Sequence, residues 1–202
     1  MDKQKLRWNG WGLYEAPDTL GDKAEGIWEW LGAYTGLGTL PHTPALSLED
    51  TEMPPVRLGP EQIQALQGML DSDRVKTDRY ERAYHARGRS YHDMLHLRRG
   101  RLEHTPDAVV YPQTIEEIEA VLRYAQENTL AIVPYGGGSS VVGGVTPLLR
   151  DGQRAVLTVD MALMNRILEV DKHTMTARIE AGIYGPELER LLQAEGVTLG
   201  HY

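Results

Sequence analysis

The chain has 202 residues and a formal net charge of -8, with 41% hydrophobic and 25% charged residues, as in a soluble globular protein. The acidic balance argues against a nucleic-acid-binding protein, and the absence of cysteine excludes disulfides, cysteine nucleophiles and thiolate metal sites. No apolar run nears the ~20 residues that a membrane-spanning helix requires, and the N-terminus lacks the apolar core of a secretory signal. These features favour a cytoplasmic protein.

The first part of the chain, residues 1–58, is expected to be irregular, because several prolines break any long helix. Its clearest feature is the segment Trp8-Asn9-Gly10-Trp11-Gly12. Two tryptophans near a terminus usually dock an arm onto a domain and bury a large apolar area. We therefore expect this segment to pack against the rest of the protein.

A helix is predicted to begin near Pro60, because proline suits the first helical position. Residues 73–104, which follow it, are locally basic, with tyrosines interleaved among the arginines. Such a stretch can track a nucleic acid, yet charge runs are more often solvated faces that pair with acidic surface elsewhere. We favour the solvated face; the alternative is that some arginines hold an anionic substrate in a larger protein. The apolar face of the predicted helix comprises Ile63, Leu66, Met69 and Leu70.

Within the basic stretch, His92-Asp93-Met94-Leu95-His96 would place two histidines on one face of a helix, where they could share a metal ion. Asp93 stands where the metalloprotease motif has glutamate, and its shorter side chain would reach a metal-bound water poorly. No third ligand is obvious, although His85 and His104 are nearby in sequence. We interpret the segment as an amphipathic one and assign no metal site.

From Pro106 the pattern changes to regular structure. Residues 108–111 are predicted to form a short strand, and Thr114 with Glu117 form a capping box that starts a helix. Residues 130–133 are predicted to form a second strand, which leads directly into a glycine-dense loop.

That loop, residues 134–144, is the most informative stretch of the chain. Consecutive glycines at a strand end let the backbone turn sharply and approach a ligand, so several N–H groups can converge on one anion such as a phosphate. It is neither a P-loop nor a dinucleotide fingerprint, since Val141 stands where the third glycine of the latter is required. A flexible surface loop is the alternative, against which Val141, Val142 and the strand flank argue. The candidate binding residues are Pro134, Tyr135, Gly136, Gly137, Gly138, Ser139, Ser140 and Val141.

The remaining segment is predicted to contain more strands and one helix. The helix opens at Gly185-Pro186 and ends at Gly196 as its C-terminal cap. One helix-linked crossover followed by strand-only connections indicates an α+β fold rather than a doubly wound sheet. The predicted strands are 156–159, 167–170, 175–179 and 197–199, and the inward residues of the helix are Leu188, Leu191 and Leu192.

Three of these segments together resemble a known family. Pro106–Pro112, the capped helix and Val133–Val141 are similar to the first half of the flavin domain of vanillyl-alcohol-oxidase-type enzymes, the PCMH-type FAD-binding domain. Within that superfamily, four further segments resemble alkyldihydroxyacetonephosphate synthases. They are Trp8–Gly12, Leu157–Asp171, Glu180–Arg190 and Leu199–Tyr202.

The resemblance implies FAD as the cofactor, with Pro134 through Ser140 wrapped around its diphosphate. It divides the chain into an N-terminal arm and helical region, 1–104, and the N-terminal part of a PCMH-type FAD-binding domain, 105–202. Segments that complete the FAD site and carry catalytic residues in the family lie beyond Tyr202, so no catalytic residue is assigned. A C-terminal half or a homodimer partner would complete the site.

The resemblance also implies an activity. Ether-lipid synthases of this family use FAD to exchange the acyl group of acyl-dihydroxyacetone phosphate for a fatty alcohol, which is compatible with peripheral membrane association. Related members oxidise 2-hydroxy acids such as lactate or glycolate. The third interpretation is a non-catalytic fragment or binding module. In each flavoenzyme the partner besides FAD is a small or lipid-like substrate, and no nucleic acid is involved.

Overall fold

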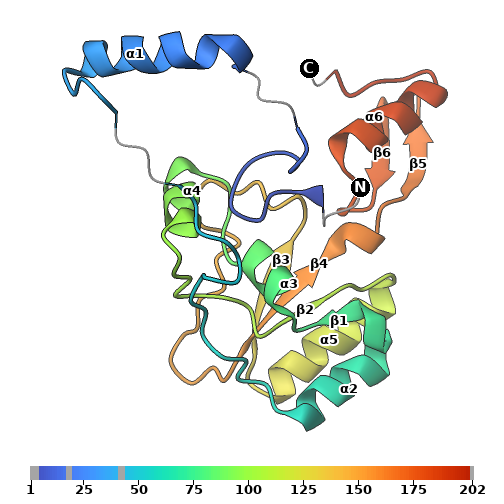
Figure 1. The fold of residues 1–202 in the computed structure, drawn as a ribbon. Helices are drawn as coiled ribbons and strands as arrows, with labels where there is room; N and C mark the ends of the chain where they lie inside the picture. Colours follow the sequence, from blue (N-terminus) through green and yellow to red (C-terminus); the bar gives the residue numbers. More distant parts are fainter. Residues whose placement is uncertain (1–4, 17–19, 41–43, 201–202) are drawn as a thin grey trace.

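The computed structural model describes residues 5–16, 20–40 and 44–200 (Figure 1). Its centre is a four-stranded sheet in the order β1-β2-β4-β3. The three strands β2 (Ala108–Val110), β4 (Val156–Asp160) and β3 (Ala131–Tyr135) are parallel, and β1 (Val75–Lys76) pairs antiparallel with β2. All five residues of β4 are buried, as expected for the central strand of a parallel sheet.

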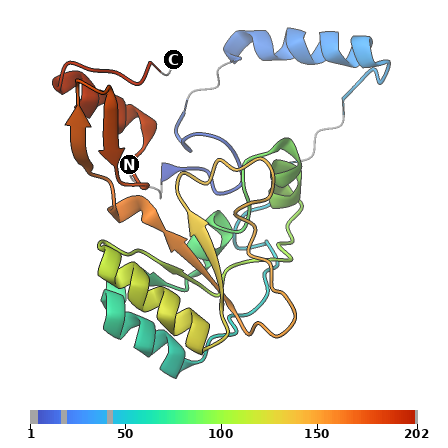
Figure 2. The same ribbon diagram turned by 180° about the vertical axis from the view of Figure 1, so that it is seen from behind.

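Two helices cover one face of this sheet. Figures 1 and 2 both show α2 (Pro60–Leu70) beside α5 (Ile115–Glu127). Leu66 and Leu70 of α2 are fully buried against Val121 of α5 and the apolar side chains of the strands, which confirms the helical face predicted from the sequence.

The start of α5 differs in one detail from the predicted capping box. Thr114 Oγ1 accepts a hydrogen bond from the Glu117 N–H at 3.2 Å, as expected. The Glu117 carboxylate accepts its shortest backbone hydrogen bond from the Gln113 N–H, at 2.7 Å, one residue before the predicted N-cap. The physical reason is Arg74, whose guanidinium binds both carboxylate oxygens of Glu117 at 2.7 and 2.8 Å and draws the side chain outward.

The opposite face of the sheet is covered by the N-terminal arm, α3 (Arg79–Tyr84) and α4 (Tyr91–Arg98). Trp8 is only 3% exposed and packs into this second core with Tyr84 and Tyr135, so the predicted docking of the arm is found at this residue. Trp11 remains 60% exposed and contributes a hydrogen bond instead of apolar burial.

The expectation that residues 1–58 are irregular is wrong for one segment. The short 3₁₀ turn η2 (Gly21–Lys23) leads into α1 (Ala24–Thr35), which ends at Gly36 in the left-handed conformation with φ 72°. No proline lies between residues 17 and 41, so nothing in the sequence prevents this helix. Both views show α1 standing apart from the sheet (Figures 1 and 2).

The last part of the chain forms a unit beyond the end of β4, after the 3₁₀ turn η4 (Met161–Leu163). An antiparallel hairpin, β5 (Ile167–Asp171) and β6 (Thr176–Ile179), lies beside α6 (Gly185–Ala194) (Figure 1). Gly196 adopts φ 74° and caps α6 as predicted. Of the three leucines expected to point inward, Leu192 is buried and the other two are half-buried.

The strand predicted at residues 197–199 does not form. The Glu189 carboxylate of α6 accepts hydrogen bonds from the Thr198 hydroxyl and, at 3.3 Å, from the Leu199 N–H, which fixes the segment as a loop. The α+β class is confirmed by the arrangement of the remaining elements. No helix among the described residues is long and apolar enough to cross a bilayer.

Candidate functional site

The glycine loop lies where three parallel strands end. Tyr135 at the end of β3 is in register with Asp160 of β4, and Val110 of β2 is in register with Val159 of β4. Ligands of such sheets bind in the crevice outside the carboxyl ends of the strands. Pro134 and Tyr135 belong to β3 itself, so the strand ends two residues later than predicted and the loop begins at Gly136.

The three consecutive glycines have different roles. Gly138 has φ 68°, and a Cβ there would collide with the hydroxyl of Tyr135, so the fold itself requires glycine at this position. At Gly137 a Cβ would meet nothing nearer than Tyr184 Cε1 at 3.9 Å, and at Gly136 it would meet only Ala181 O at 3.5 Å. The backbone of Gly136 and Gly137 is therefore open to an approaching ligand.

The loop amides are available for hydrogen bonding. No backbone N–H from Gly137 to Val141 donates to an acceptor within the described ranges of the chain. Ser140 supports the loop from inside, since its Oγ accepts from the Gly144 N–H at 3.0 Å and its carbonyl accepts from the Arg89 N–H at 2.8 Å. Unpaired N–H groups on successive residues make an anion-binding concavity.

Two valines that argued against a surface loop do not anchor it. Val141 and Val142 are 65% and 90% exposed, so this part of the sequence argument is wrong. The anchoring residues are Val145 and Pro147, which are buried after the loop has turned back toward the core. The loop is thus held at both ends, by Tyr135 and by Val145, with its middle exposed.

A small cavity of about 210 Å³ lies beside the loop. Arg89, between α3 and α4, lines it together with Gly137 and Tyr184, and the arm residues Arg7 and Trp11 form its outer wall. The Nη2 of Arg89 is buried and has no hydrogen-bond partner among the described residues. The guanidinium lies over the ring of Tyr84, 5.0 Å from its centroid.

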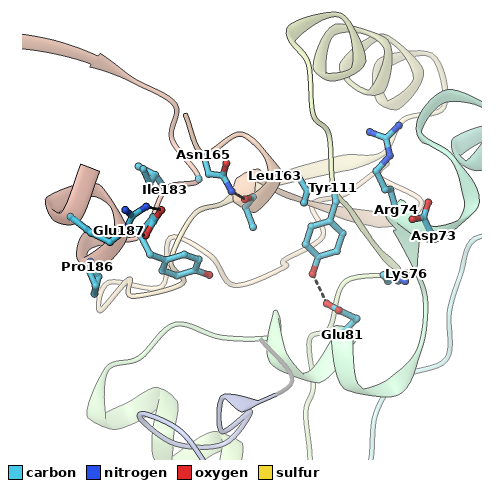
Figure 3. A pocket seen from close by; sticks show the side chains of 14 residues that line it. Asp73, Arg74, Lys76, Glu81, Tyr111, Leu163, Asn165, Ile183, Pro186 and Glu187 are labelled. Atoms are coloured by element: carbon cyan, nitrogen blue, oxygen red, sulfur yellow. Dashed lines mark hydrogen bonds and ion pairs between the residues drawn. The ribbon is translucent and has the colours of Figure 1, made fainter. Parts of the chain in front are cut away.

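A larger cavity of about 860 Å³ extends from the ends of β1 and β2 to the start of α6 (Figure 3). Most charges around it are already paired: Arg74 with Glu117, Arg190 with Glu187, and Glu81 with the hydroxyl of Tyr111 at 2.6 Å. Lys76 makes no ion pair with any residue that the structure describes.

Tyr184 lines both cavities, which therefore lie on either side of one side chain. Its hydroxyl is buried and has no hydrogen-bond partner in the described part of the chain. Burial raises the pKa of Tyr184 above its usual value, so the phenol stays protonated at neutral pH and can donate a hydrogen bond. Together with the loop amides and Arg89, it presents donors to a ligand that brings acceptors.

A buried polar network forms the base of the site. His85 Nε2 lies 2.8 Å from Asp160 Oδ2, its Nδ1 lies 2.7 Å from the Glu81 carbonyl oxygen, and both His85 and Asp160 are fully buried. The ring of Tyr135 packs edge-on against the imidazole ring of His85, with 4.3 Å between the ring centroids. Asp160 Oδ1 also accepts from the Ala162 N–H at 2.8 Å. The network ties the ends of β3 and β4 to α3.

Sequence reasoning missed this base, although Asp160 gave a signal as a carboxylate at the end of an apolar strand. His85 was considered only as a neighbour of the histidine pair in α4. Asp93 of that pair's segment caps α4 by accepting from the Ser90 N–H and hydroxyl at 3.1 and 2.7 Å. No group of three potential metal ligands is found among the described residues.

The basic stretch 73–104 is a solvated face only in part: Arg79, Arg98, Arg99 and Arg101 are exposed, as the sequence favoured, and the exception is Arg82. Arg82 is buried and donates to the carbonyl oxygens of Pro106 and Pro54 at 2.8 and 2.7 Å. Arg79 binds the carbonyl oxygens of Leu48, Glu49 and Thr51. Both arginines satisfy backbone carbonyls of a segment that has little secondary structure of its own, and these acceptors account for the burial of Arg82.

Comparison with known proteins identifies the domain. A match to the family described as FAD binding domain covers residues 106–202. An alkyldihydroxyacetonephosphate synthase of Dictyostelium discoideum is 38% identical over 162 residues, 80% of this chain and 26% of that protein. A solved alkyldihydroxyacetonephosphate synthase superposes with a TM-score of 0.84 at 32% identity, over 98% of this chain and 40% of that one.

The chain belongs to the PCMH-type FAD-binding family. A mitochondrial D-lactate dehydrogenase [cytochrome] of Arabidopsis thaliana is a more remote relative, 30% identical over 138 residues, which are 68% of this chain and 22% of that protein. The chain thus spans between about a quarter and two fifths of the length of the proteins it matches. FAD, predicted as the cofactor from the sequence, is confirmed by this family membership.

The residues present fit the group that a PCMH-type FAD-binding domain holds. The diphosphate of FAD offers anionic acceptors, and the site offers the free amides of Gly137 to Val141, the hydroxyl of Tyr184 and the guanidinium of Arg89. The backbone at Gly137 is open, as the close approach of such a group requires.

Proposed function

We propose that this chain is the FAD-binding portion of a flavoenzyme of the alkyldihydroxyacetonephosphate synthase type, and that residues 134–141 bind the FAD diphosphate. The observation that carries this proposal is the open glycine loop at the carboxyl edge of a parallel sheet, whose amides from Gly137 to Val141 have no acceptor in the described chain and whose Gly137 lines a cavity. Such backbone donors neutralise an anion without any competing carboxylate.

The residues of this chain bind and orient the cofactor. The amides of the loop hold the diphosphate, and the hydroxyl of Tyr184 donates a hydrogen bond to an acceptor of the ligand. The His85–Asp160 pair fixes the strand ends from which the loop departs. The flavin ring, when bound, supplies the reactive centre, as in other flavoenzymes. We assign no catalytic residue to the chain.

We propose exchange of an acyl group for a fatty alcohol on acyl-dihydroxyacetone phosphate as the activity of the complete protein. The support is the similarity to alkyldihydroxyacetonephosphate synthases, which extends over 98% of the chain, including the N-terminal arm. Oxidation of a 2-hydroxy acid is the second candidate, supported by similarity to a D-lactate dehydrogenase [cytochrome] over 68% of the chain.

Flavin binding is the first test. A purified protein that includes the remaining length of the relatives is titrated with FAD and followed by flavin fluorescence, with riboflavin, which lacks phosphate, as the matched control ligand. We expect FAD to bind more tightly than riboflavin, because only FAD brings a diphosphate to the loop. Equal affinity for the two flavins, or no binding of FAD, would overturn the proposed role of the loop.

The reaction is tested separately on a protein that includes the remaining length of the relatives. Acyl-dihydroxyacetone phosphate with a long-chain alcohol is compared with D-lactate and a dye acceptor. Release of fatty acid with formation of an ether supports the synthase assignment. Dye reduction by lactate, without ether formation, would contradict it and support the dehydrogenase.

A further inference from the structure

We propose that Arg89 is a ligand-binding residue of this site and donates hydrogen bonds to a phosphate of the FAD diphosphate, from the side of the glycine loop that the N-terminal arm covers. This inference rests on the proposed function, because it takes FAD as the ligand. It assigns a role to the α3–α4 loop and to the arm, both of which lie outside the segment 106–202 that matches the FAD binding domain family.

The first observation is an unsatisfied donor. Arg89 Nη1 donates to the carbonyl oxygens of Arg87 and Gly88 at 3.3 and 3.1 Å. Its Nη2 is buried and finds no acceptor among the described residues. A buried guanidinium N–H without an acceptor is unfavourable, so the position indicates an acceptor that the ligand brings.

The second observation concerns charge. Arg89 and Arg7 both line the small cavity, and neither forms an ion pair with a carboxylate in the described ranges. The other lining residues are glycines, aromatic residues and Leu6, so no acidic side chain lines the cavity beside the two guanidinium groups. A cavity lined by charge of one sign concentrates ligands of the opposite sign.

The third observation is that the main chain of Arg89 is fixed beside the glycine loop. Its N–H donates to the Ser140 carbonyl at 2.8 Å, and a Cβ at the preceding Gly88 would collide with that same carbonyl oxygen. On the other side, the indole N–H of Trp11 donates to the Arg89 carbonyl at 3.2 Å. The main chain of Arg89 is therefore clamped between the loop and the arm.

Shape and chemistry agree with a phosphate as the acceptor. The cavity of about 210 Å³ has room for a phosphate group with some of its hydration, given the ~30 Å³ that one water occupies in the liquid. Arginine binds phosphate through its planar fork, and the stacking of Arg89 on Tyr84 orients that fork. The cavity reaches Gly137, whose N–H is one of the free loop amides.

The experiment compares three variants of the protein that includes the remaining length of the relatives: Arg89→Gln, Arg89→Lys and, as a control with the same charge change, Arg99→Gln. Arg99 is exposed at the end of α4 and lines neither cavity. FAD and riboflavin affinities are measured by fluorescence, and inorganic pyrophosphate is titrated as a competitor of FAD. Melting temperatures without ligand report on folding.

We expect Arg89→Gln to bind FAD about 10- to 100-fold more weakly than the wild type, from the loss of a hydrogen bond to a charged group. Pyrophosphate should compete less well in that variant, riboflavin binding should not change, and Arg99→Gln should match the wild type. The FAD affinity of Arg89→Lys should lie between those of the wild type and Arg89→Gln, because lysine keeps the charge but loses the planar guanidinium group.

The outcomes separate the two proposals. If Arg89→Gln binds FAD as tightly as the wild type does, the role of Arg89 is overturned and the proposed FAD site is unaffected. An equal loss of riboflavin binding would also overturn it, since that result indicates a structural role. Failure of the wild type itself to bind FAD would overturn the proposed function and this inference with it. If Arg89→Gln does not fold, the same comparison is decided by Arg89→Lys.

Discussion

The base and the rim of the site differ in how completely their groups are paired. At the base, His85, Asp160 and Tyr135 are buried and in contact with one another, and the carboxylate of Asp160 bonds both a ring nitrogen and a backbone N–H. At the rim, the loop amides, Tyr184 and Arg89 keep donors without acceptors in the described chain. The difference indicates that the base serves stability and the rim serves the ligand.

The largest expected effect is at the base. Asp160→Asn replaces by an amide the buried carboxyl group that lies 2.8 Å from His85 Nε2 and accepts from the Ala162 N–H, and it should lower the free energy of unfolding by about 3 kcal/mol. Urea denaturation measures the change, with Asp151→Asn at an exposed position as the control. A loss below about 1 kcal/mol would show that the pair is not what holds the strand ends together.

The adjacent glycines provide the sharpest comparison of base and rim. Gly138→Ala places a Cβ against the Tyr135 hydroxyl at a positive φ and should cost about 2–3 kcal/mol of stability. Gly137→Ala meets open space and should change stability by less than about 0.5 kcal/mol. Thermal and urea unfolding of the two variants decide the point, and equal losses would contradict the distinction.

Features of the fold and of the site could be predicted from the sequence where they depend on residues that are close together in the chain. Strands β2 to β6, α2, α5, α6 and the glycine loop follow from apolar periodicity, caps and turn residues, which are local properties of the sequence, whereas the two-residue strand β1 was not predicted. The base was not predictable, because His85 and Asp160 are 75 positions apart and only the pairing of the strands brings them together. The burial of Arg82 was not predictable for the same reason, since its acceptors are the carbonyl oxygens of Pro106 and Pro54, which are remote in sequence.

Two local predictions failed for physical reasons that the sequence conceals. The segment 197–199 has strand-like residues, but hydrogen bonds from Thr198 and Leu199 to Glu189 hold it as a loop. The helix α1 lies in a segment where several prolines predict irregular structure, but no proline falls inside the helix itself. In the first case the hydrogen bonds to Glu189, and in the second the positions of the prolines, decided the structure, and the overall composition of the segment did not.

A smaller effect is expected from the paired charges at the edge of the larger cavity. The hydrogen bonds from Arg74 lower the pKa of Glu117, so this carboxylate stabilises the fold above its unfolded-state pKa, and that contribution is lost as the pH falls through the folded-state pKa. Glu117→Gln should cost about 1 kcal/mol at pH 7, and the difference from the wild type should shrink below about pH 4. A pH-independent difference between the two proteins would contradict this origin.

The smallest effect on stability is expected at the rim, with the opposite sign. Tyr184→Phe removes a buried hydroxyl that has no partner in the described chain, so the variant should be as stable as the wild type or slightly more stable. Its affinity for FAD should fall about 2- to 10-fold, from the loss of one neutral hydrogen bond. The raised pKa of Tyr184 implies no change in this contribution between pH 6 and pH 9. Reduced stability with unchanged affinity would reverse the assignment of Tyr184 to the rim.

Binding of the diphosphate by the backbone amides of residues 137–141 is tested most directly by NMR of the ¹⁵N-labelled chain. Amide resonances are followed while FAD is added, and in parallel while riboflavin is added. The account predicts that FAD, but not riboflavin, causes the largest shifts at Gly137 to Val141, with further shifts at Arg89. Resonances of the loop that stay unchanged at FAD saturation, with the shifts located elsewhere, would contradict it.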